Sequence, residues 1–277
     1  MKLNEKRPPV QDEEEKEKPL PRRIASVLKA VAGKPDPKYF TSAVIVAAGS
    51  STRMEGGSKQ MLPLAGIPVV VHTLRAFAMT PCIHEIIIVA KESEIPMYDE
   101  LIKEYELQKI TKIIPGGQSR QESVRFGLDA VDERSMYIAI SDGARCLVTE
   151  DMITRVCRNA YIHGAATAAV RATDTVKIGD KNAFVESTTE RKRTWQAQTP
   201  QVFKTNLYRA AAYVALQKGV EGTDDNKLVE AIGYPVKLVD CGKENIKITT
   251  PLDLYLAEAI LRYRRECTDR PEKRTEG

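Results

Sequence analysis

Short unbroken apolar runs alternate with segments of helical periodicity along most of this chain. An unbroken run is typical of a strand buried on both faces, and the periodic segments indicate helices with one apolar face. We expect strands at SAVIVAA (42–48), EIIIVA (85–90), ITKII (110–114), MYIAIS (136–141), VKLVD (236–240) and NIKIT (245–249).

The segments between these runs predict helices whose ends carry recognisable signals. Gly164 and Gly233 stand where two helices should stop. Thr250, Pro251 and Asp253 form a capping pattern at the start of the last helix. The alternation of strands and helices predicts an α/β fold with a mostly parallel sheet flanked by helices. We expect the helices at 69–79, 94–105, 119–131, 150–164, 206–219, 224–233 and from 250 onward.

The alternation is interrupted over residues 172–198. Residues 175–178 and 183–187 have strand character and flank the turn residues GDKN (179–182), which indicates a β-hairpin. A hairpin that projects from an α/β core has an exposed edge that needs cover. We therefore expect this arm to be covered by a partner subunit.

Composition and charge narrow the class of protein. The 277 residues are 42% hydrophobic and carry a net charge of +4, which fits a globular protein that binds a small anion better than nucleic acid. No apolar run approaches the roughly 20 residues of a membrane helix, so we expect no membrane span. Five scattered cysteines without a C-x-x-C pair predict reduced thiols and a cytoplasmic location.

The two ends of the chain differ from its middle. Residues 1–38 are rich in proline and charge, so we expect a disordered or weakly helical tail, with a short helix at 24–33. Residues 39–267 are then a single domain that carries the arm, and residues 268–277 are a disordered C-terminal tail.

The first candidate site is the loop after the first strand, AAGSSTRMEGGSKQ (47–60). It contains neither the P-loop pattern nor G-x-G-x-x-G. The small residues from Ala47 to Ser51 let backbone N–H groups approach a phosphate or a base. Arg53 adds a bidentate phosphate donor, and Lys59 adds a mobile positive charge. We interpret the loop as an anion site, and an ordinary strand-to-helix loop is the alternative.

Polar clusters follow two further strands. Gly116 and Gly117 precede Ser119, which can cap the next helix, and a helix N-terminus favours an anion or a base edge. Asp142 ends another strand, where a carboxylate can hold Mg²⁺ against a triphosphate, and Arg145 lies close by. A scattered set of hydroxyls and cations in the second half suits a second phosphate: Thr175, Arg191, Thr199, Thr223 and Lys247.

The motifs occur in the order AAGSSTRM, SKQMLPLAGIPVVVHTL, GGQSRQESV, SDGAR, DTVK, WQAQTPQVF, TDDNKLVEAIG and NIKITTPLDLYLAEAIL. In this order they resemble the 2-C-methyl-D-erythritol 4-phosphate cytidylyltransferase family of the non-mevalonate isoprenoid pathway, from about Ser42 to Leu261. The resemblance implies a Rossmann-like domain, a β-arm that makes a homodimer, and transfer of a cytidylyl group from CTP to methylerythritol phosphate. It also implies release of pyrophosphate, and Mg²⁺ as the cofactor.

The same resemblance implies a role for each candidate residue. Arg53, Lys59 and Lys247 would be catalytic, and Asp142 would contact the metal. CTP would contact Ala47, Ala48, Gly49, Arg53, Lys59, Gly117 and Ser123. Methylerythritol phosphate would be surrounded by Asp142, Arg145, Thr175, Arg191, Thr199, Thr223 and Lys247, with Thr175 and Arg191 reaching across the dimer.

The residue types agree with this chemistry. A phosphate monoester is already a nucleophile near neutral pH, so positioning and charge neutralisation suffice, and cations matter more than histidines. Ribitol-5-phosphate cytidylyltransferase, other nucleotidyltransferases and a non-catalytic nucleotide-binding homologue are the alternatives. The chain departs from the family's usual pattern at Gln118, Ser141, Gly143 and Cys146.

Overall fold

A computed structural model describes residues 39–49 and 58–269 of the chain, and these residues belong to one compact unit. The predictions for the N-terminal tail, for Ser50, Ser51 and Arg53, and for residues 270–277 lie outside the described residues.

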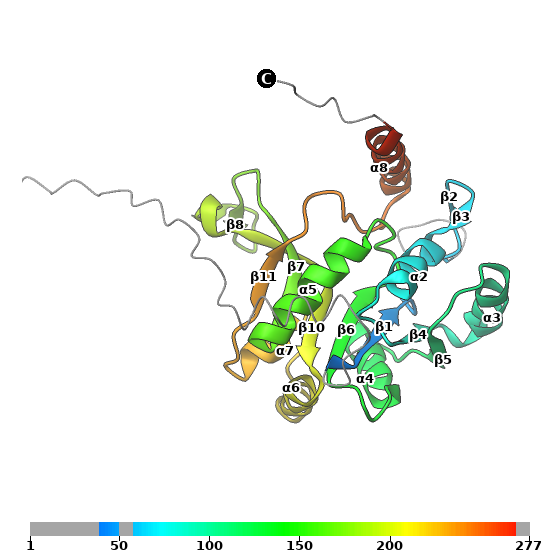
Figure 1. Ribbon diagram of the computed structural model, residues 1–277. Helices are drawn as coiled ribbons and strands as arrows, with labels where there is room; N and C mark the ends of the chain where they lie inside the picture. The colour runs from blue at the N-terminus through cyan, green and yellow to red at the C-terminus, as the bar shows by residue number, and fades with distance from the viewer. Residues whose placement is uncertain (1–38, 50–57, 270–277) are drawn as a thin grey trace, which may run out of the picture. The chain divides into compact units, whose positions relative to one another are not determined.

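A seven-stranded sheet forms the centre of the unit, in the order β11-β7-β10-β6-β1-β4-β5 (Figure 1). β10 pairs antiparallel with β6 and β7, and the other neighbours pair parallel. The predicted α/β fold with a mostly parallel sheet is therefore confirmed. The strands are β1 Thr41–Val46, β4 Glu85–Ala90, β5 Ile110–Pro115, β6 Tyr137–Asp142, β7 Ala165–Arg171, β10 Trp195–Lys204 and β11 Lys237–Asp240.

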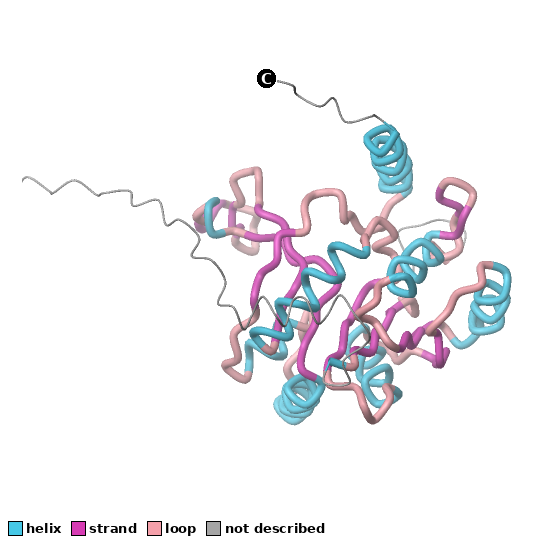
Figure 2. Tube along the Cα trace, in the orientation of Figure 1, coloured by secondary structure: helices cyan, strands magenta, loops and turns pink. Residues whose placement is uncertain are grey.

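Helices follow these strands and flank the sheet (Figure 2). Most of the predicted helices form within a residue or two of their expected bounds, and Gly164 ends α5 in the left-handed conformation, as predicted. The helices are α2 Val69–Met79, α3 Ile95–Glu104, α4 Arg120–Ala130, α5 Glu150–His163, α6 Thr205–Lys218, α7 Asn226–Ala231 and α8 Pro251–Asp269. Four further short elements are β2 Pro63–Leu64, β3 Ile67–Pro68, η2 Glu92–Glu94 and η3 Arg191–Arg193.

The core explains why the strands are unbroken apolar runs. Val44 and Val46 of β1 pack into one cluster with Val124 and Leu128 of α4 and with residues of α6 and α7. The residues between them, Ala43 and Ile45, are equally buried and face the opposite side of the sheet. Figure 1 shows α2 and α5 across that side.

The segment NIKIT (245–249) is not a strand, so that prediction is wrong. The alternation is real, because Ile246 and Ile248 both pack into a second apolar cluster. The backbone, however, has other partners: Ile248 N donates to Ala144 O, and Asn245 O accepts from the Arg145 guanidinium. A segment that bonds to a loop and a side chain in this way joins no sheet.

The start of α8 follows its predicted capping pattern. Oδ2 of Asp253 accepts hydrogen bonds from the backbone N–H groups of Thr249 and Thr250, at 2.7 Å each. The helix reaches Asp269, two residues past the boundary expected from the sequence. The carboxylate thus fixes where α8 begins, directly after the segment that carries Lys247.

The predicted hairpin is present as β8 (Lys177–Gly179) paired antiparallel with β9 (Val185–Thr188). Both strands are exposed along their whole length, and Phe184 and Val185 have exposed fractions of 72% and 64%. Large apolar side chains in an exposed hairpin are a feature of surfaces that bind another protein. The predicted hairpin is confirmed by the pairing of β8 with β9, while its role as a dimerisation arm stays a prediction.

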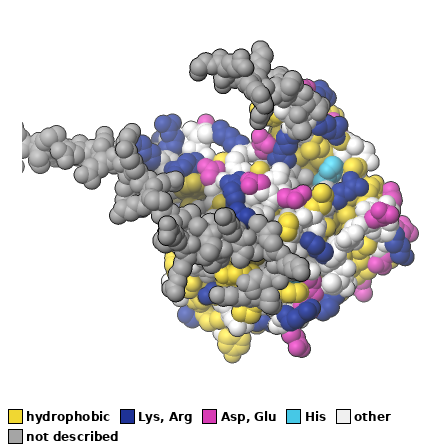
Figure 3. All heavy atoms as spheres, in the orientation of Figure 1, with side chains coloured by type: hydrophobic (Ala, Val, Ile, Leu, Met, Phe, Trp, Pro, Cys, Tyr) yellow, Lys and Arg dark blue, Asp and Glu magenta, His cyan; other side chains and the backbone are white. Residues whose placement is uncertain are grey.

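The surface carries mixed charge. On the face seen in Figure 3, basic and acidic side chains are interspersed among apolar ones. Within residues 39–49 and 58–269, no helix is long and apolar enough to cross a membrane.

Candidate functional site

A cavity of about 400 Å³ lies beyond the carboxyl ends of β1, β5 and β6. This is the edge at which ligands bind in open α/β sheets. The three polar clusters that the sequence placed after strands all contribute to it. The lining residues are Val46, Ala48, Gly49, Lys59, Gln60, Gly117, Gln118, Ser119, Arg120, Ser123, Asp142, Ala144 and Lys247.

The loop after β1 forms one wall of this nucleotide-sized cavity. Ala47 is buried and its N–H donates to Val89 O at 2.7 Å, which fixes the start of the loop on β4. Ala48 and Gly49 line the cavity, and Lys59 lines it from the far end of the loop. Arg53, the predicted phosphate donor, lies outside the described residues.

The glycine turn after β5 forms the opposite wall. A Cβ on Gly116 would lie 2.3 Å from Cβ of Ala48, so only glycine lets the two loops approach this closely. Gly117 N donates to Oγ of Ser123, and Ser119 caps α4 by accepting from Glu122 N, both at 3.1 Å. The predicted cap of α4 is therefore confirmed.

Asp142 lies at the floor of the cavity between two cations. Its Oδ1 accepts from Nε of Arg120 at 3.1 Å, and its Oδ2 lies 2.8 Å from Nζ of Lys247. Burial by itself raises the pKa of this carboxyl, but the two cations outweigh burial and hold the pKa well below its usual range. Asp142 is therefore ionised at neutral pH and matches a positively charged site.

Arg120 is a member of the site that the sequence analysis did not single out. Besides Asp142, it contacts Asp225, whose Oδ2 lies 2.8 Å from the guanidinium. One signal was available in the sequence. Arg120 is the first residue of α4, where the helix dipole disfavours a cation. A cation at this position is therefore expected to have a specific anionic partner.

A second cavity, of about 380 Å³, lies next to the first. Of the residues that the structure describes, four cations line it, and Lys247 alone also lines the first cavity. Arg145 is held there by a 2.6 Å hydrogen bond from its guanidinium to Asn245 O. The lining residues are Arg145, Val170, Arg171, Thr173, Gln196, Ala197, Gln198, Lys243, Asn245, Ile246 and Lys247.

Thr199 contacts the end of β6 next to the first cavity. Its Oγ1 accepts from the backbone N–H of Asp142 at 3.1 Å and lies 3.0 Å from Oγ of Ser141. Both hydroxyls are buried, so they satisfy each other. Ser141, a departure from the family pattern, therefore has a structural partner in this chain.

Five of the predicted residues that the structure describes line neither of these two cavities. Ala47 and Thr199 are buried. Thr175 and Arg191 are exposed on the arm, and Thr223 is exposed on the loop before α7. The structure therefore brings together most of the described CTP set and part of the second-substrate set, and leaves these five outside the two cavities.

The donor set for a metal is small. Among residues 39–49 and 58–269, Asp142 is the only carboxylate that lines either of the two cavities. Among the described residues, no group of three or more His, Cys, Asp or Glu could hold a metal ion. Mg²⁺ bound mainly by substrate phosphates needs only one or two protein carboxylates, so Asp142 alone is compatible with it.

Comparisons with known sequences all give the same family. A family model described as IspD, 2-C-methyl-D-erythritol 4-phosphate cytidylyltransferase, matches residues 41–263. An enzyme of that name from Caldanaerobacter subterraneus is 44% identical over 223 residues, which cover 80% of this chain and 98% of the relative. Another from Syntrophus aciditrophicus is 45% identical, over 79% of this chain and 95% of the relative.

Solved structures agree with the sequence relatives. The 4-diphosphocytidyl-2C-methyl-D-erythritol synthase from Anaerococcus prevotii superposes with a TM-score of 0.74 at 30% identity, over 81% of this chain and 97% of that one. The 2-C-methyl-D-erythritol 4-phosphate cytidylyltransferase from Thermus thermophilus gives a TM-score of 0.67 at 32% identity, covering 80% and 99%.

Proposed function

Because this chain belongs to the 2-C-methyl-D-erythritol 4-phosphate cytidylyltransferase family, we propose that its two cavities hold the two substrates of that enzyme. The reaction joins CTP to methylerythritol phosphate and yields 4-diphosphocytidyl-2-C-methyl-D-erythritol and pyrophosphate. The first cavity takes CTP, and the more basic second cavity takes the sugar-alcohol phosphate. The observation that carries this assignment is Lys247, which lines both cavities.

The nucleotide lies between the two glycine-containing loops. Ala48 and Gly49 would offer backbone to the nucleotide, and Ala47 holds the start of their loop on β4. Gly117 and Ser123 would contact the cytosine and ribose. Lys59 and, from the loop outside the described residues, Arg53 contact the phosphates. The close approach of the two loops at Gly116 and Ala48 favours a flat base and a phosphate chain over a bulkier ligand.

The chemical step is an in-line displacement at the α-phosphorus of CTP. A phosphate oxygen of methylerythritol phosphate forms the new bond, and the bond to the β-phosphate oxygen breaks as pyrophosphate leaves. Lys59, Lys247 and Arg53 offset the negative charge that gathers on the α-phosphate. The two substrates are both anions, so holding them together is itself a large part of the task.

We propose Mg²⁺ as the cofactor of this reaction. It would neutralise triphosphate charge and orient the leaving pyrophosphate. Asp142 is the residue of this chain that would contact it, directly or through water. The ion pairs of Asp142 with Arg120 and Lys247 support a secondary role for that carboxylate, with the phosphates as the main ligands.

In a homodimer, residues of the arm could contact the substrate bound to the other subunit. Thr175 and Arg191 line neither of their own chain's two cavities, yet both lie on an arm with exposed apolar side chains. In a dimer the arm of one subunit would reach the second cavity of the other. Arg145 and Lys247, which line the second cavity, would meet the same substrate from within the subunit. Thr199 would act through its hydrogen bond to Asp142, and Thr223 would approach from the loop before α7. The five free thiols fit a reducing cytoplasm, where we place the protein.

The alternatives are not favoured. The relatives carry the methylerythritol phosphate name, which argues against ribitol phosphate as the acceptor. A non-catalytic homologue would not need Lys59, Asp142 and Lys247 together around one cavity.

The test is pyrophosphate release from CTP and Mg²⁺ with either acceptor. Methylerythritol phosphate should support rapid release, and ribitol phosphate should support little. Faster release with ribitol phosphate would overturn the acceptor assignment. No release with either acceptor would contradict the enzyme assignment.

A further inference from the structure

We propose that Arg120 is a positioning residue for the cytidylyl transfer. It bridges two carboxylates, Asp142 at the end of β6 and Asp225 at the start of α7. Through Asp142 it sets the position of the Lys247 ammonium group between the two substrate cavities. This inference rests on the proposed function.

The bridge uses two different nitrogens of one rigid group. Nε of Arg120 donates to Oδ1 of Asp142 at 3.1 Å, and Nη2 lies 2.8 Å from Oδ2 of Asp225. The guanidinium is planar with its donors at fixed angles, so it holds the two carboxylates at a fixed separation. A lysine has a single nitrogen on a flexible stem and does not reproduce this geometry.

Asp225 is a firm anchor for the bridge. Its side chain is 2% exposed, its Oδ1 accepts from Tyr208 OH at 2.6 Å, and its backbone N donates to Gln201 Oε1 at 2.9 Å. A buried carboxylate depends on its cation, because an unpaired charge in the interior is costly. Asp225 is not among the described residues that line the nucleotide cavity, and its direct contact with that lining is through Arg120.

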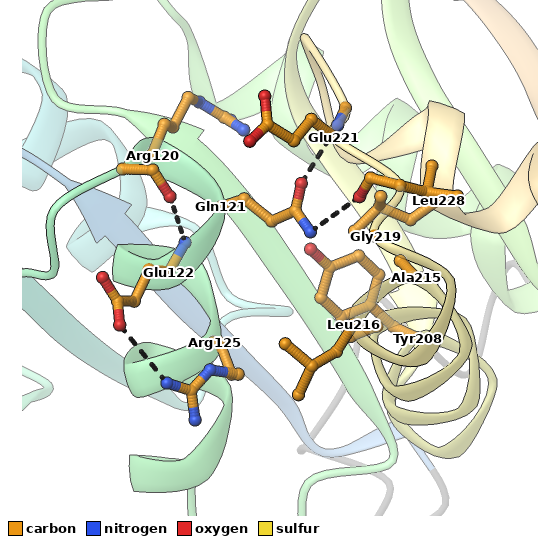
Figure 4. Close-up of a pocket in the computed structure, with 14 residues that line it drawn as sticks. Arg120, Gln121, Glu122, Arg125, Tyr208, Ala215, Leu216, Gly219, Glu221 and Leu228 are labelled. Atoms are coloured by element: carbon orange, nitrogen blue, oxygen red, sulfur yellow. Dashed lines mark hydrogen bonds and ion pairs between the residues drawn. The ribbon is translucent and has the colours of Figure 1, made fainter.

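The next residue of α4 fastens the same loop. Gln121 Oε1 accepts from Gly222 N at 3.0 Å, and its Nε2 donates to Val220 O at 3.2 Å (Figure 4). The loop that carries Thr223 is thus tied to α4 by Gln121 before it and to Arg120 by Asp225 after it. The nucleotide cavity and the Thr223 loop are therefore held as one piece.

The bridge also divides the oxygens of Asp142. Oδ1 pairs with Arg120, and Oδ2 pairs with Lys247. Without Arg120 the carboxylate is free to rotate, both oxygens become available to Lys247, and the ammonium group shifts away from the shared edge of the cavities. A displacement of about 1 Å at such a point can lower turnover by about 100-fold.

Arg120 also lines the nucleotide cavity, so a direct contact with CTP is the competing explanation. The two explanations differ at Asp225. If Arg120 only supplies charge to the nucleotide, Asp225→Asn releases Arg120 and changes turnover little. If Arg120 acts through the bridge, Asp225→Asn lowers turnover although it touches no substrate cavity.

The experiment measures kcat and the two KM values for wild type, R120Q, R120K, D225N and R120Q/D225N, with R125Q as the control. Arg125 lies on the same helix and pairs with surface carboxylates. We expect kcat to fall about 100-fold in R120Q and about 10-fold or more in R120K and D225N. The double variant should be no slower than R120Q, because both changes break one bridge. The KM for CTP should change less than threefold in D225N.

Two results would overturn the proposal. One is wild-type kcat in D225N. The other is a loss of activity in D225N that unfolding fully explains. In that case kcat divided by the folded fraction, which urea unfolding gives, equals the wild-type value. If wild type itself releases no pyrophosphate, the proposed function fails instead, and the two failures are therefore distinguishable.

Discussion

Nζ of Lys247 lies 2.8 Å from Oδ2 of Asp142, and this ion pair joins the segment before α8 to the carboxyl end of β6. The pair stands where the nucleotide cavity meets the second, basic cavity. It therefore fixes the position of a cation between two anionic substrates, and it is also an electrostatic contact within the fold.

The ion pairs of Asp142 predict a defined pH dependence of stability. The pKa of Asp142 is lowered in the folded state, so its contribution is complete above the unfolded value near 3.8 and is lost as pH falls below it. The free energy of unfolding of wild type, relative to D142N, should decline by about 1.4 kcal/mol per pH unit in that window. Urea titrations between pH 7 and pH 3 measure this, and a constant difference across the range would refute it.

Lys59→Ala should lower kcat by about 100-fold or more, because it removes a cation from the phosphates under attack. Lys218→Ala is the matched control. Lys218 lies exposed at the end of α6, lines neither substrate cavity, and should leave kcat unchanged. Steady-state pyrophosphate release measures both variants. A near-wild-type rate in Lys59→Ala would remove Lys59 from the mechanism.

Arg191→Ala should raise the KM for methylerythritol phosphate about 10- to 100-fold, with little effect on the KM for CTP, because a charge-assisted contact to the acceptor phosphate is lost. Arg193→Ala is the control from the same short helix, and Arg193 pairs with Glu190 on the surface. Unchanged acceptor kinetics in Arg191→Ala would contradict the role of the arm.

Mixed dimers test whether the arm acts across subunits. Neither R191A nor K247A homodimers should be fully active. If the arm reaches the partner's cavity, a heterodimer of the two variants contains one cavity that carries both lesions and one that carries neither. Activity recovered on mixing supports the dimer, and mixtures no more active than the separate variants argue that each subunit works alone.

Gly116→Ala should destabilise the fold by about 1–3 kcal/mol, because its Cβ would meet the Cβ of Ala48 at 2.3 Å. Gly179→Ala is the control, since its nearest neighbour is Phe184 O at 3.7 Å, and it should change stability by less than about 0.5 kcal/mol. Urea unfolding at one protein concentration compares them. Equal stability of the two variants would show that the loops separate easily.

Much of the fold was predictable because it depends on local signals. The unbroken runs of β1, β4 and β6 identified buried strands, Ser119 and Asp253 identified helix starts, and Gly164 identified a helix end. Polar residues directly after strands identified the edge of the sheet that carries the first cavity. These signals are read within a few residues, so the sequence displays them directly.

The failures have a common physical reason. NIKIT has the alternation of a strand, but its neighbours Ala144 and Arg145 come from a loop far away in the sequence. The position of Arg120 at the start of α4 indicated an unusual cation but not its partners, because these carboxylates lie on β6 and at the start of α7. Contacts between distant segments have no local pattern.

The sequence by itself determined the α/β class, the parallel strands, the projecting hairpin and the residue types that meet two anionic substrates. Periodicity, caps and turn residues act over short stretches of chain, and the motif order carried the family resemblance. Only the tertiary structure decided that Lys247 stands between the two cavities and that Arg120 ties Asp142 to Asp225. Charges separated by many residues find one another only when the folded core brings their elements together and excludes water from between them.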